Sequence, residues 1–209
     1  QYSSGSNSWS QLGNDIDGEA AGDYSGRSVS LSEDGTIVAI GAIYNDGNGN
    51  ASGHTRIYQY SSGSNSWSQL GNDIDGEAAG DYSGGSVSLS ADGSIVAIGA
   101  DYNDGNGNAS GHTRIYKYSS GSNSWSKLGS DIDGEAANDY SGEYVSLSSD
   151  GKTVAIGATG NDGNGSNSGH VRIFQLDSTS PTISSFSPAD NATAVATTSN
   201  IVLNFSEAV

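Results

Sequence analysis

Apolar and small polar residues alternate in short segments that recur along the chain. Between Ser28 and Ser32, valine and leucine alternate with serine, which is the period-two pattern of a strand with one buried face. Thr36 to Ala42 is apolar at successive positions, so this predicted strand needs cover on both faces. Glu33-Asp34-Gly35 predicts a tight turn between the two strands. The pattern therefore predicts a hairpin buried between other layers.

Two more strands are predicted around each hairpin, at Ser8 to Leu12 and at His54 to Tyr60. The whole unit repeats with a period of 58 residues, as the spacing of Trp9, Trp67 and Trp125 shows. The predicted periods are residues 2–59, 60–117 and 118–175. The first two copies differ at five positions: Arg27/Gly85, Glu33/Ala91, Thr36/Ser94, Ile43/Asp101 and Gln59/Lys117.

Four short antiparallel strands per repeat are typical of a β-propeller blade, and the fold class is therefore predicted to be all-β. With the Ser28–Ser32 strand innermost, each blade takes its fourth strand from the start of the next period. The third blade then lacks that strand, while Ser8 to Leu12 has no preceding blade. Either further repeats precede Gln1, which is the favoured interpretation, or chains complete one another head to tail, as a ring or a filament.

Composition narrows the functional classes. The chain has 24 acidic and 7 basic residues and a net charge of −17, which argues against nucleic-acid binding. Apolar residues make up 33%, so thin repeated cores are expected. Cysteine is absent, which excludes disulfides and Cys-ligated zinc. No signal peptide or membrane-spanning run is recognised, and because Gln1 falls inside a repeat, a piece of a longer chain or a mature product is expected.

The segments GDYSGRSV (22–29) and TIVAIGA (36–42) resemble the FG-GAP repeat of integrin α-subunit propellers and of bacterial surface proteins. The resemblance covers roughly residues 1–176. It implies a secreted or cell-surface propeller. Ser32-Glu33-Asp34-Gly35 stands where integrin repeats carry a DxDxDG calcium loop, so the family's metal ligands are not carried over.

Residues 177–209 differ in character, because both prolines lie here and glycine disappears. The segment resembles the first strands of a bacterial Ig-like domain, which implies a partial β-sandwich. Too few strands are present to bury a core alone. They are expected to continue past Val209, to pack on the propeller, or to pair with another chain.

Two acidic loops per repeat are candidate Ca²⁺ sites. The first alternates oxygen-bearing side chains with glycine, a pattern that suits a hard cation. Its residues are Asp46, Asn48, Asn50, Asp104, Asn106, Asn108, Asp162, Asn164 and Ser166. The alternative site is the acidic connector, with Asp15, Asp17, Glu19, Asp73, Asp75, Glu77, Asp131, Asp133 and Glu135. Each loop is also consistent with a solvated turn that holds no metal.

Other repeated side chains are interpreted mainly as structural. His54 and its equivalents are expected to hydrogen-bond to backbone, and Arg56 and its equivalents to pair with carboxylates or carbonyls between blades. The three tryptophans are expected to anchor blade packing, with glycan stacking as the alternative. No nucleophile elbow or unique histidine–nucleophile pair is present, so an enzyme is not expected.

The sequence therefore predicts a secreted or cell-surface structural or adhesive repeat protein that is rigidified by calcium and self-assembles into an array or filament. Its expected partners are other copies of itself, or a cell-surface protein or glycan, without insertion into the membrane. Two alternatives remain open: a glycan-binding, lectin-like propeller module, and the accessory propeller of a larger secreted enzyme.

Overall fold

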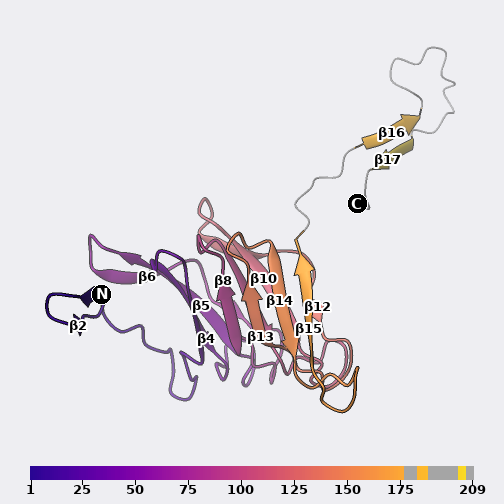
Figure 1. The fold of residues 1–209 in the computed structure, drawn as a ribbon, viewed down its shortest axis with the longest axis horizontal. Helices are drawn as coiled ribbons and strands as arrows, with labels where there is room; N and C mark the ends of the chain where they lie inside the picture. Colours follow the sequence, from indigo (N-terminus) through magenta and orange to yellow (C-terminus); the bar gives the residue numbers. More distant parts are fainter. Residues whose placement is uncertain (177–182, 188–201, 206–209) are drawn as a thin grey trace. The chain divides into compact units, whose positions relative to one another are not determined.

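The computed structural model describes residues 1–176, 183–187 and 202–205, and these form antiparallel sheets without a helix. Accordingly, the described residues offer no helix suited to crossing a membrane. The chain divides into two compact units, Gln1–Gln175 and Leu176–Val209. Within the first unit the sheets follow one another in chain order (Figure 1).

The first two repeats form sheets with the same topology, in which consecutive strands are neighbours and an extra short strand pairs with the third. The first blade contains β3 (Ser28–Leu31), β4 (Ile37–Ala42), β5 (His54–Ser61), β6 (Ser66–Gln69) and β7 (Ile74–Asp75). The second blade contains β8 (Ser86–Leu89), β9 (Ile95–Ala100), β10 (His112–Ser119), β11 (Ser124–Lys127) and β12 (Ile132–Asp133).

The third blade has three strands and lacks a fourth among the described residues. These strands are β13 (Ser141–Leu147), β14 (Thr153–Ala158) and β15 (His170–Gln175). A two-stranded hairpin, β1 (Tyr2–Ser3) with β2 (Ser8–Trp9), precedes the first blade. In the second unit, β16 (Ile183–Ser187) pairs with β17 (Val202–Phe205). Other expectations for residues 177–209 lie outside the described residues.

The predicted all-β blades are confirmed, and so is the strand order with the Ser-Val strand at one edge and the tryptophan strand at the other. The short strands β7 and β12 were not predicted, because Ile74 and Ile132 lie in connectors that read as acidic loops. Each pairs with the start of the third strand, as His54 opposite Asp75 shows. The acidic connector is thus part of the sheet.

The core lies between successive blades. Ala39 and Ile57 of the first blade pack against Val87, Val96 and Ile98 of the second. Equivalent residues, shifted by 58, form the core between the second and third blades. Both faces of β9 are buried, as expected for its apolar sequence, because the second blade has a neighbour on each side. In β14 buried and half-buried residues alternate, since its outer face lacks a following blade in the described structure.

Glycine sets the distance between blades. A Cβ atom at Gly41 would overlap the carbonyl of Gly84, and one at Gly99 would overlap the carbonyl of Gly142. At the same contact Ser86 Oγ donates a hydrogen bond of 2.7 Å to Gly142 O. Because the two backbones meet at this point, only glycine fits at Gly41 and Gly99, the second-last residues of β4 and β9.

Candidate functional site

The two acidic loops of neighbouring repeats touch each other. The side-chain amide of Asn48 donates to the carbonyls of Gly76 and Glu77, both at 2.9 Å. Asn106 makes the equivalent bonds to Gly134 and Glu135. The asparagine-rich loop of one repeat therefore supports the acidic connector of the next.

Within the asparagine-rich loop, the predicted ligands turn toward different partners. Asp46 Oδ1 accepts hydrogen bonds from the backbone amide of Ala51 at 2.8 Å and from Asn50 Nδ2 at 3.5 Å. Asn48, in contrast, donates its side-chain hydrogen bonds to the connector of the next repeat. Asp104 and Asp162 cap their loops as Asp46 does. The loop is held by its own hydrogen bonds, and calcium binding there stays a prediction.

In the connectors, the first aspartate of each accepts a hydrogen bond from the side chain four residues earlier, at 2.6–2.8 Å. These pairs are Gln11–Asp15, Gln69–Asp73 and Lys127–Asp131. The second aspartate position contributes its backbone carbonyl, which accepts from an arginine of the next blade. These pairs are Arg56–Asp17, Arg114–Asp75 and Arg172–Asp133.

The same arginines form ion pairs with the connector glutamates. Arg56 Nη1 lies 3.6 Å from Glu19 Oε1, and Arg114 Nη1 lies 3.5 Å from Glu77 Oε1. Arg114 belongs to the second blade and also bonds to Asp75 of β7, which is part of the first sheet. The prediction that these arginines satisfy carboxylates and carbonyls between blades is confirmed.

The histidines do not behave as expected. His54 is 1% exposed, but its Nδ1 has no hydrogen-bond partner and faces two carboxylates, Glu19 at 3.7 Å and Asp73 at 3.9 Å. The backbone hydrogen bond expected of the histidines is therefore not made by Nδ1 of His54. Burial lowers the pKa of His54 and of His112 below its usual value, although neighbouring carboxylates act in the opposite direction. Burial thus favours the neutral form of both rings.

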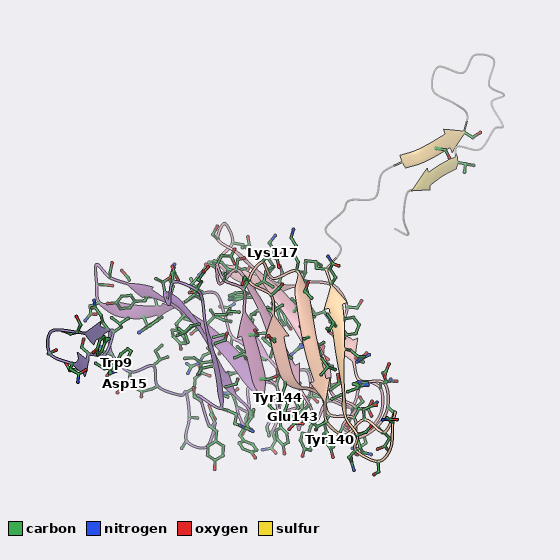
Figure 2. All side chains as sticks on the ribbon, in the orientation of Figure 1. Trp9, Asp15, Lys117, Tyr140, Glu143 and Tyr144 are labelled. Carbon is green, nitrogen blue, oxygen red and sulfur yellow. The ribbon has the colours of Figure 1, made fainter. Side chains whose placement is uncertain are left out.

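The tryptophans differ by position. Trp125 packs against the core between the first two blades, and its Nε1 donates a hydrogen bond of 2.9 Å to Leu70 O. Trp67 makes the same bond to Leu12 O. Trp9, on the N-terminal hairpin, is 82% exposed (Figure 2). The packing interpretation is confirmed for Trp125, and glycan stacking stays a prediction.

Tyrosines form a row at one edge of the blades, which the sequence pattern did not predict. Neighbouring ring centroids lie 5.0–5.4 Å apart, mostly edge to face. The row runs Tyr24, Tyr44, Tyr82, Tyr102, Tyr140. Figure 2 places Tyr140 at the opposite end of the blades from Lys117. The signal available in the sequence was the repeated Asp-Tyr-Ser-Gly segment, but its separation from Tyr44 hid the contact.

A cavity of about 320 Å³ opens beside this row. Its lining combines three tyrosines with charged side chains, and comprises Arg27, Ile43, Tyr44, Tyr82, Gly85, Asp101, Tyr102 and Glu143. Two of the five positions at which the first two repeats differ, Arg27/Gly85 and Ile43/Asp101, are in this lining. Burial raises the pKa of Asp101, and the Glu143 carboxylate acts in the same direction. The repeats therefore diverge where a ligand could be held asymmetrically.

Family comparisons agree with this architecture. The FG-GAP repeat matches residues 16–58 and 131–174, and the bacterial Ig-like domain matches residues 177–209. The chain therefore contains FG-GAP repeats of β-propeller type, followed by a bacterial Ig-like segment. Both are typical of extracellular or surface proteins.

Two solved structures are similar in part. Hydrazine synthase of Kuenenia stuttgartiensis is 14% identical with a TM-score of 0.44, over 71% of this chain and 33% of that one. The periplasmic gluconolactonase PpgL of Pseudomonas aeruginosa is 15% identical with a TM-score of 0.46, over 71% of this chain and 38% of that one. The chain thus spans less than two fifths of either protein. No curated protein sequence matches it.

Proposed function

We propose that the chain is a non-catalytic structural module of a secreted or cell-surface protein, and that its blades associate head to tail between copies. The observation that supports this proposal is that, among the described residues, an apolar blade face is exposed at each end of the repeats. Adhesion would follow from display of the assembled blades, with the Ig-like segment as a spacer.

The face of the first blade, here the leading face, keeps the residues of an internal interface. Val29 and Leu31 are 64% and 59% exposed, whereas Val87 and Leu89, their equivalents in the second blade, are 8% and 7% exposed. Each apolar side chain left in water forgoes about 1.5–3 kcal/mol of burial free energy. The leading face therefore matches a surface that already binds a blade elsewhere in the same chain.

The face of the third blade, here the trailing face, is apolar as well. Val171 and Ile173 are 65% and 70% exposed, and Val171 lines a hollow of about 510 Å³ together with Tyr144. Tyr144 and Val171 replace a serine and a threonine of the earlier repeats, which makes this face more apolar. A blade that ended a stack in solvent would be expected to change toward polar residues.

The edges of the blades are complementary too. The third blade lacks its fourth strand among the described residues, and the N-terminal hairpin carries a tryptophan strand without a blade. In β10–β11, Tyr118 pairs with Trp125, and Tyr2 pairs with Trp9 in the hairpin in the same register. A neighbouring copy could therefore supply both a covering face and the missing strand. Tyr144 stands where Ser86 bonds to the next blade, so this interface differs locally from the internal ones.

Sedimentation velocity between about 1 and 200 µM tests the proposal. Wild-type chain is expected to form concentration-dependent oligomers. The double variant Val29→Asp/Ile173→Asp should stay monomeric with an unchanged thermal midpoint, because both side chains are exposed. A wild-type chain that remains monomeric throughout this range would contradict the proposal.

Calcium is the second part of the proposal. We expect Ca²⁺ to rigidify the acidic loops. At a free Ca²⁺ concentration of 100 times Kd, each occupied site adds about 2.7 kcal/mol to the free energy of unfolding. The thermal midpoint should rise in millimolar Ca²⁺ relative to excess EDTA. Asp46→Asn, Asp104→Asn and Asp162→Asn together keep the loop's hydrogen-bond acceptors but remove its charge, and should abolish the rise. If the thermal midpoint still rises in the triple variant, the ions bind at the acidic connectors. If it does not rise in the wild-type chain, calcium does not stabilise the loops.

The tyrosine row favours one alternative, a glycan-binding module. Aromatic faces beside carboxylates and a guanidinium offer both stacking and hydrogen bonds to a polyhydroxylated ligand. A glycan array probed with wild-type chain and with Tyr102→Ala should show hits that the variant loses. Trp9→Ala would separate this site from the exposed tryptophan, and an array without hits would remove the alternative.

A further inference from the structure

Three side chains from three separate segments meet beside β5. Glu19 comes from the first connector, His54 opens β5, and Asp73 comes from the following connector. Their ligand atoms all lie within 4.8 Å of one another, with His54 Nδ1 3.7 Å from Glu19 Oε2 and 3.9 Å from Asp73 Oδ2. The second repeat brings together Glu77, His112 and Asp131 in the same way.

The imidazole of His54 points into this cluster without a hydrogen bond. It is 99% buried, and Nδ1 has no partner, because 3.7 and 3.9 Å exceed hydrogen-bond range. A buried polar atom left unpaired is unfavourable. In the second repeat His112 Nδ1 lies 3.9 Å from Glu77, and its Nε2 is buried without a partner. A bound cation would resolve the arrangement around His54 Nδ1.

The spacing suits a small divalent ion. Zinc binds imidazole nitrogen and carboxylate oxygen at about 2.0–2.2 Å, so ligand atoms of a tetrahedral site lie about 3.3–3.6 Å apart. Both distances from His54 exceed this spacing by a few tenths of an ångström, and the carboxylates of Glu19 and Asp73 are partly exposed, so they can move closer to His54 and to each other. His54 is fixed by burial and supplies a preset ligand.

Arg56 arranges the charge around the cluster. Its Nη1 faces Glu19 Oε1 at 3.6 Å, while the other carboxylate oxygen, Oε2, is the one that faces His54. In the first cluster one guanidinium opposes two carboxylates, so this cluster keeps a net negative charge that attracts a cation. In the second cluster Lys127 also pairs with Asp131, at 2.8 Å, and the charge argument therefore applies to the first cluster alone. Calcium takes six to eight oxygen ligands, whereas imidazole suits zinc and its neighbours among the transition metals.

We propose that the first two blades each bind one divalent transition metal of the zinc class, at Glu19–His54–Asp73 and at Glu77–His112–Asp131. Each ion would fasten the third strand of a blade to the connectors before and after it. The third repeat has Glu135 and His170, but the position equivalent to Asp73 is Ala189, which lies outside the described residues. The expected stoichiometry is therefore two ions per chain.

Calorimetric titration of untagged, chelator-stripped chain with Zn²⁺ alone tests this. Wild type is expected to bind two equivalents, and Co²⁺ should give the visible absorption of a low-symmetry site. Asp73→Asn with Asp131→Asn, near-isosteric changes at partly exposed positions, should weaken both sites at least tenfold. His54→Gln with His112→Gln should do the same, while the matched control His170→Gln should leave two equivalents.

Circular dichroism of the metal-free variants separates lost binding from lost folding. Absence of Zn²⁺ binding by folded wild type, a third equivalent, or two equivalents that survive both pairs of substitutions would each overturn the proposal. The site is independent of head-to-tail association, because its ligands come from within one chain. The monomeric Val29→Asp/Ile173→Asp variant should bind the same two ions.

Discussion

Gly99 and Gly157 occupy the same position in successive repeats, but among the described residues only Gly99 meets a following blade. A Cβ at Gly99 would overlap the Gly142 carbonyl, whereas at Gly157 its nearest neighbour would be Tyr144 Cβ at 3.5 Å. Gly99→Ala should therefore destabilise the chain by about 2–3 kcal/mol. Gly157→Ala should change the free energy of unfolding of the monomeric Val29→Asp/Ile173→Asp background by less than about 0.5 kcal/mol. Urea unfolding of both variants in that background measures the contrast, and equal losses would mean that the blades are not held this closely.

The aspartate of each turn between the first two strands of a blade gives the chain a pH dependence. Hydrogen bonds from Ser90 Oγ and from the Ser94 backbone amide lower the pKa of Asp92. Corresponding hydrogen bonds lower the pKa values of Asp34 and Asp150. Because the pKa of such a carboxyl group is lower in the folded state, its ionised form stabilises the fold at pH values above the pKa in the unfolded chain, which is near 3.9. This contribution to stability is lost as the pH falls through the pKa in the folded state.

Changing Asp34, Asp92 and Asp150 to asparagine should consequently lower the thermal midpoint most at pH 6–7. The difference from wild type should shrink as the pH falls from about 5 toward 2. Calorimetry at several pH values follows this difference. A difference that does not vary with pH would show that the turn charges play no part.

At the scale of elements, the strands were predictable because apolar alternation and turn residues recur in all three repeats. The Ser-Val strand, the apolar strand and the tryptophan strand were each expected within a few residues of their bounds. Strands β7 and β12 were not, since Ile74 and Ile132 are single apolar residues within acidic segments. Their pairing depends on the partner strand, which no local pattern reveals.

The outer strands provide a matched comparison of tryptophans. Trp125 packs on the core and bonds to Leu70 O, whereas Trp9 is largely exposed on the hairpin. Trp125→Ala should cost about 2–3 kcal/mol, somewhat below the loss for a fully buried tryptophan. Trp9→Ala should cost little in the free energy of unfolding of the monomer. Similar losses would mean that the hairpin is packed in solution.

At the scale of the whole molecule, the stacking of blades could be predicted, but the grouping of side chains at the loops could not. Asp15, Asp17 and Glu19 read as one local cluster, yet the structure separates them among different partners and places Glu19 with His54 and Asp73. The tyrosine row likewise joins residues of successive repeats. Such contacts depend on the angle between blades, which a period of 58 residues does not specify.

The leading face and the trailing face are proposed to fit each other. Val29→Asp alone should disable the leading face, and Ile173→Asp alone should disable the trailing face. Each single variant should be monomeric, and an equimolar mixture of the two should form a one-to-one dimer, because each retains the face that the other lacks. Light scattering on size-exclusion fractions gives the masses. A mixture that stays monomeric, or a single variant that still dimerises with itself, would contradict head-to-tail association.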